Sequence, residues 1–239
     1  MILAYHQIVN EPSRYLYAVT TGRMREHIDL LLRRKALGHS DTGITFDDGW
    51  ESHRLAAGIL EDAGLRGTFF ITPAWVGTQR FLDVCDLREL AEHGHEVQSH
   101  GWSHTLLPRC GPAELRMELR RSKETLEDWL GRKVDAISVP GGAYNSAVLN
   151  AAAEAGYRRV YTSDAWNAPV EHEGALVAGR FMVRNSTTAA RLEQLLATEG
   201  HRFSAPSLAQ SFRRALRSTL GLSLYQALWR VAARHDDRL

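Results

Sequence analysis

The segment Ile44-Thr45-Phe46-Asp47-Asp48-Gly49-Trp50 joins a short apolar strand to two adjacent carboxylates. Its first three residues are β-branched or aromatic and favour a buried strand. Two neighbouring carboxylates repel each other, and burial increases the repulsion, so a bound cation would stabilise them. The same residues would also suit an ordinary Asp-Gly turn. This segment alone therefore leaves a metal site and a simple turn both open.

A second segment, His95-Glu96-Val97-Gln98-Ser99-His100-Gly101-Trp102-Ser103-His104, places two histidines four residues apart after another short apolar strand. If the segment turns helically, His100 and His104 lie on one face. Together with one carboxylate they make a two-histidine, one-carboxylate set with open positions, which is typical of catalytic metal sites. A surface histidine pair in a polar loop is the alternative. The two segments together favour a metal site.

Short apolar strands alternate with helical patterns along most of the chain. Strands are predicted at residues 2–6, 43–46, 67–72, 96–99, 136–139, 157–162 and 176–183. Helices are predicted at residues 23–37, 50–63, 86–93, 112–130, 145–156 and 188–199, with Asp86 as the cap of the third. This alternation predicts an α/β fold with a parallel sheet, either doubly wound or closed as a barrel. Both polar segments follow strands, where such folds build active sites.

Composition limits the classes of protein that the chain can belong to. Its 239 residues, 44% of them hydrophobic, suit one α/β domain with a sizeable core. A net charge of +1 gives no reason to expect a nucleic-acid partner. No apolar run reaches the length of a transmembrane segment. Residues 1–6 lack the features of a signal peptide, so a cytoplasmic location is expected.

The motifs resemble those of the polysaccharide deacetylases, the NodB-homology group known as carbohydrate esterase family 4. Thr45 to Gly49 is similar to the first motif of that family, Ser99 to His104 to the second, and Val139-Pro140-Gly141-Gly142-Ala143-Tyr144 to a variant of the third. The similarity covers roughly residues 2–187. It implies an irregular (β/α) barrel of about seven parallel strands, one fewer than in the regular barrel.

The resemblance also implies a division of roles among the polar residues. Asp48, His100 and His104 would hold one divalent ion, with zinc expected and cobalt or nickel as alternatives. Asp47 would stay unligated and act as the catalytic base. Such an ion lowers the pKa of a water molecule and polarises the acetyl carbonyl. From physics alone, either aspartate could be the ligand.

Substrate-binding residues are expected on the loops at the same end of the sheet. By resemblance, the backbone N–H of Gly141, directly after Pro140, would donate to the oxyanion. The glycines there would equally serve a plain strand-to-helix turn. Four aromatic rings could form walls for a sugar ring, although each could instead be packing: Tyr144, Trp75, Trp102 and Trp166.

The chain departs from the family pattern in two places. The family often carries an arginine before the proline of the third motif, where it braces the catalytic aspartate. Here that region is Ile137-Ser138-Val139, and Ser138 cannot supply a charge. Relatives often carry a late histidine as general acid, but residues 179–184 contain none, and Arg184 is too basic to donate a proton. His6, His172 or His201 could replace it, or Asp47 could shuttle the proton itself.

After about residue 200 the composition changes, and leucines alternate with arginines. This pattern predicts one or two amphipathic helices outside the barrel. We therefore divide the chain into a deacetylase-like barrel at residues 1–200 and a helical extension at residues 201–239, packed on or beside it. A membrane-surface or partner-binding role is the alternative, and homo-oligomers could form through this extension.

The function predicted from the sequence is that of a metal-dependent hydrolase. It would remove acetyl groups from an N-acetylated or O-acetylated sugar, such as an N-acetylhexosamine in a glycan or a glycan precursor. One alternative is the same fold hydrolysing a non-sugar amide or a cyclic imide. Another is a catalytically impaired barrel that binds carbohydrate without turnover, which the missing arginine and histidine would explain.

Overall fold

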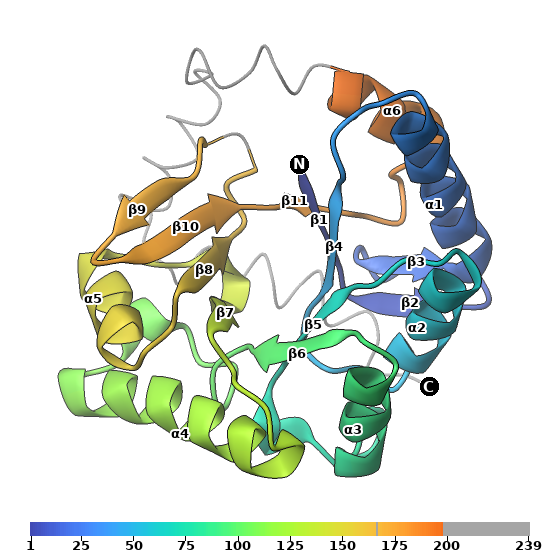
Figure 1. Ribbon diagram of the computed structural model, residues 1–239. Coiled ribbons are helices and arrows are strands. Elements are labelled where there is room, and N and C mark those ends of the chain that lie inside the picture. The colour runs from blue at the N-terminus through green and yellow to red at the C-terminus, as the bar shows by residue number, and fades with distance from the viewer. Residues whose placement is uncertain (166, 198–239) are drawn as a thin grey trace.

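A computed structural model describes residues 1–165 and 167–197 of the chain, in which helices surround a curled sheet (Figure 1). The strands are β1 (Ile2–Tyr5), β2 (Gln7–Val9), β3 (Ala18–Thr20), β4 (Gly43–Phe46), β5 (Thr68–Ile71), β6 (Glu96–Ser99), β7 (Ala136–Ser138), β8 (Arg159–Thr162), β9 (Val170–His172), β10 (Ala175–Gly179) and β11 (Phe181–Met182). The α-helices are α1 (Thr21–Ala36), α2 (His53–Asp62), α3 (Val84–Glu92), α4 (Pro112–Leu130), α5 (Ser146–Glu154) and α6 (Ala189–Ala197).

The main sheet curls back onto its first strand. Its order is β11-β1-β4-β5-β6-β7-β8-β10-β9, and every pair except β9–β10 is parallel. β10 pairs with β8, and β11, which follows after the single residue Arg180, pairs with β1. Counted as one strand, β10 and β11 complete a deformed (β/α) barrel of seven parallel strands within the described chain. The predicted fold class is confirmed.

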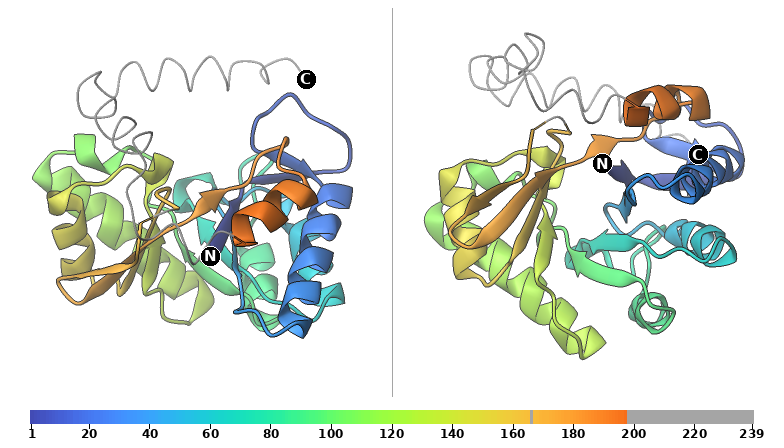
Figure 2. Two further views of the ribbon diagram at one scale, coloured as in Figure 1. Left: turned by 90° about the horizontal axis from the view of Figure 1, so that it is seen from above. Right: turned by 45° about the horizontal axis from the view of Figure 1, so that its top comes forward.

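Local sequence explains where the helices begin and end. Helix α4 starts at Pro112, whose fixed backbone angle suits a first helical turn, and ends at Gly131 in the left-handed conformation (φ 61°). Asn145 caps α5, because its side chain accepts a hydrogen bond from the backbone N–H of Val148. The helices pack around the outside of the sheet (Figure 2), and the stacked rings of Phe46 and Phe69 fill the layer between the sheet and α2, where both contact His53.

Several local predictions were wrong. Asp86 does not cap α3; Asp83 does, and Asp86 is its partner three residues later in a capping box. Between the first predicted strand and the first predicted helix, β2 and β3 form a separate two-stranded sheet that was not predicted. The sheet is not wholly parallel, because the unpredicted edge strand β9 runs antiparallel to β10. These short segments carry too few residues for periodicity to reveal them.

The strand predicted at residues 176–183 is interrupted at Arg180, where the chain changes partner from β8 to β1. The predicted C-terminal extension, residues 201–239, lies outside the described residues, so the proposed domain division stays a prediction. In the described part of the chain, no helix is both long enough and apolar enough to cross a membrane.

Candidate metal centre

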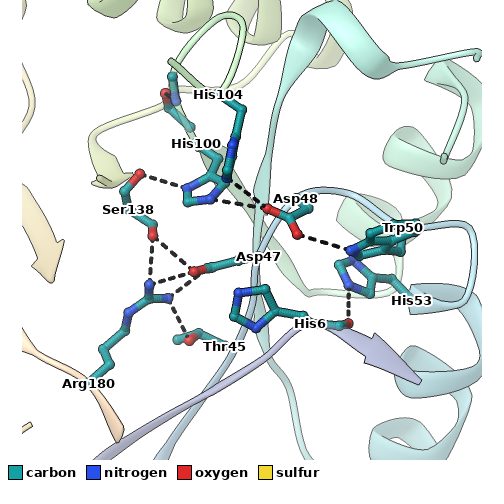
Figure 3. A network of polar contacts seen from close by, with 12 residues as sticks. His6, Thr45, Asp47, Asp48, Trp50, His53, His100, His104, Ser138 and Arg180 are labelled. Atoms are coloured by element: carbon teal, nitrogen blue, oxygen red, sulfur yellow. Dashed lines mark hydrogen bonds and ion pairs between the residues drawn. The ribbon is translucent and has the colours of Figure 1, made fainter. Parts of the chain in front are cut away.

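Three side chains from two strand ends converge at the carboxyl end of the sheet (Figure 3). Asp48 is the second residue after β4. His100 and His104 lie in the loop after β6. The Oδ1 atom of Asp48 is 3.3 Å from the Nε2 atoms of both histidines. One ligand atom from each residue lies within 4.8 Å of the others. The three residues named from the sequence are thus brought together as expected.

The two histidines reach this point without a helix. The loop after β6 is irregular through residue 106, and His104 has a left-handed backbone (φ 62°), as does Asp48 (φ 83°). Such conformations are uncommon for residues other than glycine and cluster at functional sites. The expectation of a helical turn was therefore wrong, although the meeting of the imidazoles that it implied is confirmed.

The donors of this cluster are arranged to accept a cation. His100 Nδ1 donates to the carbonyl oxygen of Ser138 (2.7 Å), which leaves Nε2 of the neutral ring with a free lone pair. Trp50 Nε1 donates to Asp48 Oδ2 (3.0 Å) and so turns Oδ1 toward the histidines. Within residues 1–165 and 167–197, Asp48 Oδ1 is buried and has no hydrogen-bond partner. A divalent ion would satisfy this orphaned oxygen, so the residues fit a metal site.

The pKa shifts of Asp48 and His100 in the metal-free centre also reflect a site that favours positive charge. Burial alone would raise the pKa of Asp48, but the imidazoles of His100 and His104, 3.3 Å from its Oδ1, hold that pKa well below 3.8. Burial alone would lower the pKa of His100, but Asp47 and Asp48 outweigh it and raise the pKa above 6.5. Without metal, the two carboxylates therefore favour the protonated form of the His100 ring. Metal must displace that proton, so its affinity should fall with decreasing pH.

Asp47, the predicted base, is buried beside this cluster and is held by an arginine (Figure 3). Arg180 donates from Nη1 to Asp47 Oδ1 (2.8 Å) and from Nη2 to Oδ2 (2.7 Å). Ser138 Oγ donates to Asp47 Oδ2 (3.2 Å). Burial would raise the pKa of Asp47, yet the charge of Arg180, followed by that of His100, lowers it to about 2. Asp47 is therefore ionised.

Arg180 was missed as a site residue. It is only 1% exposed and comes from the break between β10 and β11, far in sequence from the third motif. Its Nη2 also donates to Ser138 Oγ (2.6 Å), so the small Ser138 accommodates the guanidinium. A charged residue inside the otherwise apolar segment at residues 175–183 was the available signal. Arg180 thus supplies, from another strand, the positive charge that Ser138 lacks.

Among the three histidines considered as proton donors, only His6 lies at the centre in the described chain. It directly follows β1 and is buried beneath Asp47 and Asp48 (Figure 3). Its ring stacks on that of Tyr17 at 4.8 Å between ring centroids. Among the described residues, its Nδ1 is buried without a hydrogen-bond partner. His172 pairs with Ala175 at the start of β10, at the opposite end of the sheet, and bonds Asn150. His201 lies outside the described residues.

The third motif forms a tight turn at the rim of the centre. Pro140 is buried, and Gly141 has a left-handed backbone (φ 62°). A Cβ atom at Gly141 would lie 2.9 Å from a methyl carbon of Leu106, so only glycine fits without movement. Tyr144 donates its hydroxyl to Asp164 Oδ2 (3.4 Å), which links this turn to the loop after β8.

The aromatic rings predicted to line a sugar site differ in their surroundings. Trp75 lies next to the metal ligands, with its ring centroid 5.0 Å from that of His104. Trp102 is half-buried, and the Arg121 guanidinium covers one face of its ring at 3.7 Å from the centroid. Trp166 lies outside the described residues. Trp75 thus contacts a candidate metal ligand directly, while contact with a sugar stays a prediction for all four rings.

Comparison with known proteins agrees with this geometry. The family model described as polysaccharide deacetylase matches residues 34–160, and the chain belongs to this family. A putative polysaccharide deacetylase of Bacillus subtilis, YxkH, is 30% identical over 122 residues, which cover 51% of this chain and 44% of the relative. A peptidoglycan-N-acetylglucosamine deacetylase of Bacillus cereus is 28% identical over 122 residues, covering 50% and 55% respectively. The chain spans about half the length of these curated relatives.

Solved structures show the same fold. The deacetylase PplD of Streptococcus pyogenes, in complex with acetate, superimposes with a TM-score of 0.69 at 20% identity, covering 82% of this chain and 96% of that one. IcaB from Ammonifex degensii gives a TM-score of 0.66 at 20% identity, with 82% and 95% covered. The deformed barrel of this chain is therefore that of the carbohydrate esterase family 4 structures.

Proposed function

We propose that this protein is a metal-dependent deacetylase acting on an acetylated sugar. The observation that carries the proposal is the convergence of Asp48, His100 and His104 around an orphaned carboxylate oxygen, beside an ionised and unligated Asp47. Two imidazoles and one carboxylate suit zinc, with cobalt or nickel as alternatives. An ion held there would acidify a water molecule and polarise the acetyl carbonyl.

Asp47 is the proposed base. Its carboxylate is ionised and is held by Arg180 on the side opposite His100, as drawn in Figure 3. Both oxygens are fixed in one orientation, which prevents Asp47 from swinging to join Asp48 as a second ligand. A positioned carboxylate of this kind can take the proton from the attacking water. Gly141 N–H is our candidate donor to the oxyanion that forms.

His6 is the proposed proton donor to the leaving group. Burial lowers its pKa below 6.5, although Asp48 and Asp47 oppose this shift by stabilising the protonated ring. A histidine with a lowered pKa gives up a proton readily once it holds one. His53 Nε2 donates to the backbone carbonyl of His6 (2.8 Å) and fixes the chain at that point.

An acetylated glycan is the proposed substrate because relatives of known name act on such material. The Bacillus cereus relative is named for peptidoglycan N-acetylglucosamine, and a Bradyrhizobium relative, 28% identical over 147 residues, is named a chitooligosaccharide deacetylase. The reading of a barrel that binds carbohydrate without turnover rested on two missing side chains. Arg180 provides the absent charge, and His6 offers a replacement for the late histidine, so turnover is favoured.

Acetate release from a panel of acetylated sugars, measured with and without chelator, tests the proposal. Chelator should abolish release, and zinc, cobalt or nickel should restore it. The panel should include N-acetyl and O-acetyl sugars, a non-sugar acetamide and a cyclic imide. Hydrolysis confined to the last two would replace the sugar with the other substrate class, and glycan binding without acetate release would refute turnover.

A further inference from the structure

We infer that Glu118 of α4 is a positioning residue that holds the loop bearing His100 and His104 in its metal-binding shape before any metal is present. The inference rests on the proposed metal site and deepens it. Glu118 is only 2% exposed, although it belongs to a helix on the outer surface of the barrel. A carboxylate is rarely buried unless its oxygens are hydrogen-bonded, so its partners explain its position.

Every hydrogen bond recorded for Glu118 goes to the histidine loop. Its Oε2 accepts from the backbone N–H groups of Trp102 and Ser103, both at 3.0 Å. Its Oε1 accepts from the Ser103 hydroxyl at 2.6 Å. These two N–H groups belong to the residues directly between the two metal ligands. Successive backbone N–H groups that point at one carboxylate make an anion-binding concavity, which fixes the local backbone.

Two further residues of α4 hold the same loop. Arg121 covers the ring of Trp102, and Ser122 shares a hydrogen bond with Ser99 (2.8 Å) at the end of β6. Ser99 Oγ also accepts from Gly101 N–H (3.2 Å). Positions 118, 121 and 122 are spaced by three and four residues, so they lie on one face of the helix. This face of α4 therefore contacts the loop from Ser99 to Ser103.

Such a brace matters because of the loop's unusual backbone. Gly101 and His104 both have a positive φ, at 75° and 62°. A non-glycine residue in that conformation is strained and persists only when its surroundings hold it there. Glu118 provides three hydrogen bonds within two residues of His104. Without them the loop could relax, and the two Nε2 atoms would no longer point at the same place.

The test compares metal affinity in four purified full-length proteins: wild type, Glu118→Ala, Glu118→Gln and Glu124→Ala. Glutamine keeps one oxygen for the two backbone N–H groups but removes the charge. Glu124 is exposed on the same helix and serves as the matched control. Zinc dissociation constants are measured by competition with a chromophoric chelator, and the cobalt-loaded proteins give visible absorption spectra that report ligand geometry.

Loss of a residue that orients metal ligands typically weakens metal affinity about 10- to 100-fold. We expect a loss of this size in Glu118→Ala with an altered cobalt spectrum, and wild-type spectra with a loss below about threefold in Glu118→Gln and Glu124→Ala. Wild-type affinity in Glu118→Ala would overturn the inference. An equal loss in Glu118→Gln would also overturn it, because the charge and not the hydrogen bonds would then be responsible.

A measurement on wild-type protein keeps the inference testable if Glu118→Ala does not fold. Amide hydrogen exchange at Trp102 and Ser103 should be slow in metal-free protein and little changed by metal. Fast exchange that becomes slow only with metal would show that the metal itself orders the loop. Absence of metal binding by the wild type would instead refute the proposed function, so the two failures are distinguishable.

Discussion

The pair of Arg180 and Asp47 gives the sharpest test of how this site is built, through the variant Arg180→Met. Methionine fills much of the same space but leaves the Asp47 carboxylate buried without its charged partner. Asp47 and Arg180 are 2% and 1% exposed, and two hydrogen bonds of 2.7 and 2.8 Å join them. Removing one member of a buried ion pair costs about 3–5 kcal/mol of unfolding free energy.

The stability of the metal-free protein should depend on pH, in a direction that the pKa of Asp47 determines. In wild type the pKa of Asp47 is about 2, below its ordinary 3.8, so the ionised carboxylate stabilises the fold by roughly 2 kcal/mol. That stabilisation is present above about pH 4 and is lost as the pH falls toward 2. In Arg180→Met, burial is no longer outweighed by Arg180, so the pKa of Asp47 rises. If it exceeds the unfolded value, Asp47 destabilises the variant increasingly as the pH rises from the unfolded pKa to the raised folded pKa, and by a constant amount at higher pH.

The assay is urea unfolding of chelator-treated protein at several pH values, followed by circular dichroism. Arg25→Met is the control, because Arg25 pairs with Asp62 on the surface, where both side chains are more than half exposed; its loss should cost about 0–1 kcal/mol. The double variant Arg180→Met/Asp47→Asn should be more stable than Arg180→Met, because it leaves no buried charge without a partner. A cost below about 1 kcal/mol for Arg180→Met, or no recovery in the double variant, would refute this account of the site.

Three further outcomes are expected. Asp47→Asn should keep its metal while turnover falls roughly a hundredfold to ten-thousandfold, whereas Asp48→Asn and the double variant His100→Ala/His104→Ala should lose metal and activity together. Metal analysis and acetate release, measured on the same samples, test these roles, and metal loss in Asp47→Asn would contradict them. His6→Ala should keep its metal and lose turnover over the same range, while the matched change His172→Ala, on the far edge of the sheet, should alter neither; full activity in His6→Ala would exclude it as the proton donor. Truncation after Gly200 should leave metal content unchanged but alter solubility or size in solution, and a soluble product of unchanged size by light scattering would remove the packing and assembly roles from the C-terminal segment.

Much of the fold and the candidate metal ligands could be predicted from the sequence because they depend on local patterns. Strand β6 and helix α4 were predicted to the residue, because Gly94 and Gly101 bound the strand and a long amphipathic period between Pro112 and Gly131 marks the helix. Asp48, His100 and His104 each follow a strand. Parallel strands carry their carboxyl ends to one edge of the sheet, so sequence position alone implied that these side chains would meet.

Only the tertiary structure decided which residues complete the centre. Arg180 contacts Asp47 across 133 positions of sequence, because the strand that carries it changes partner from β8 to β1 at that residue. His6 faces the site because β1 lies beside β4 in the barrel. Sequence periodicity shows which face a residue occupies, but not which distant residue lies opposite it. The register of a closed sheet fixes that pairing, and it exists only once the barrel has formed.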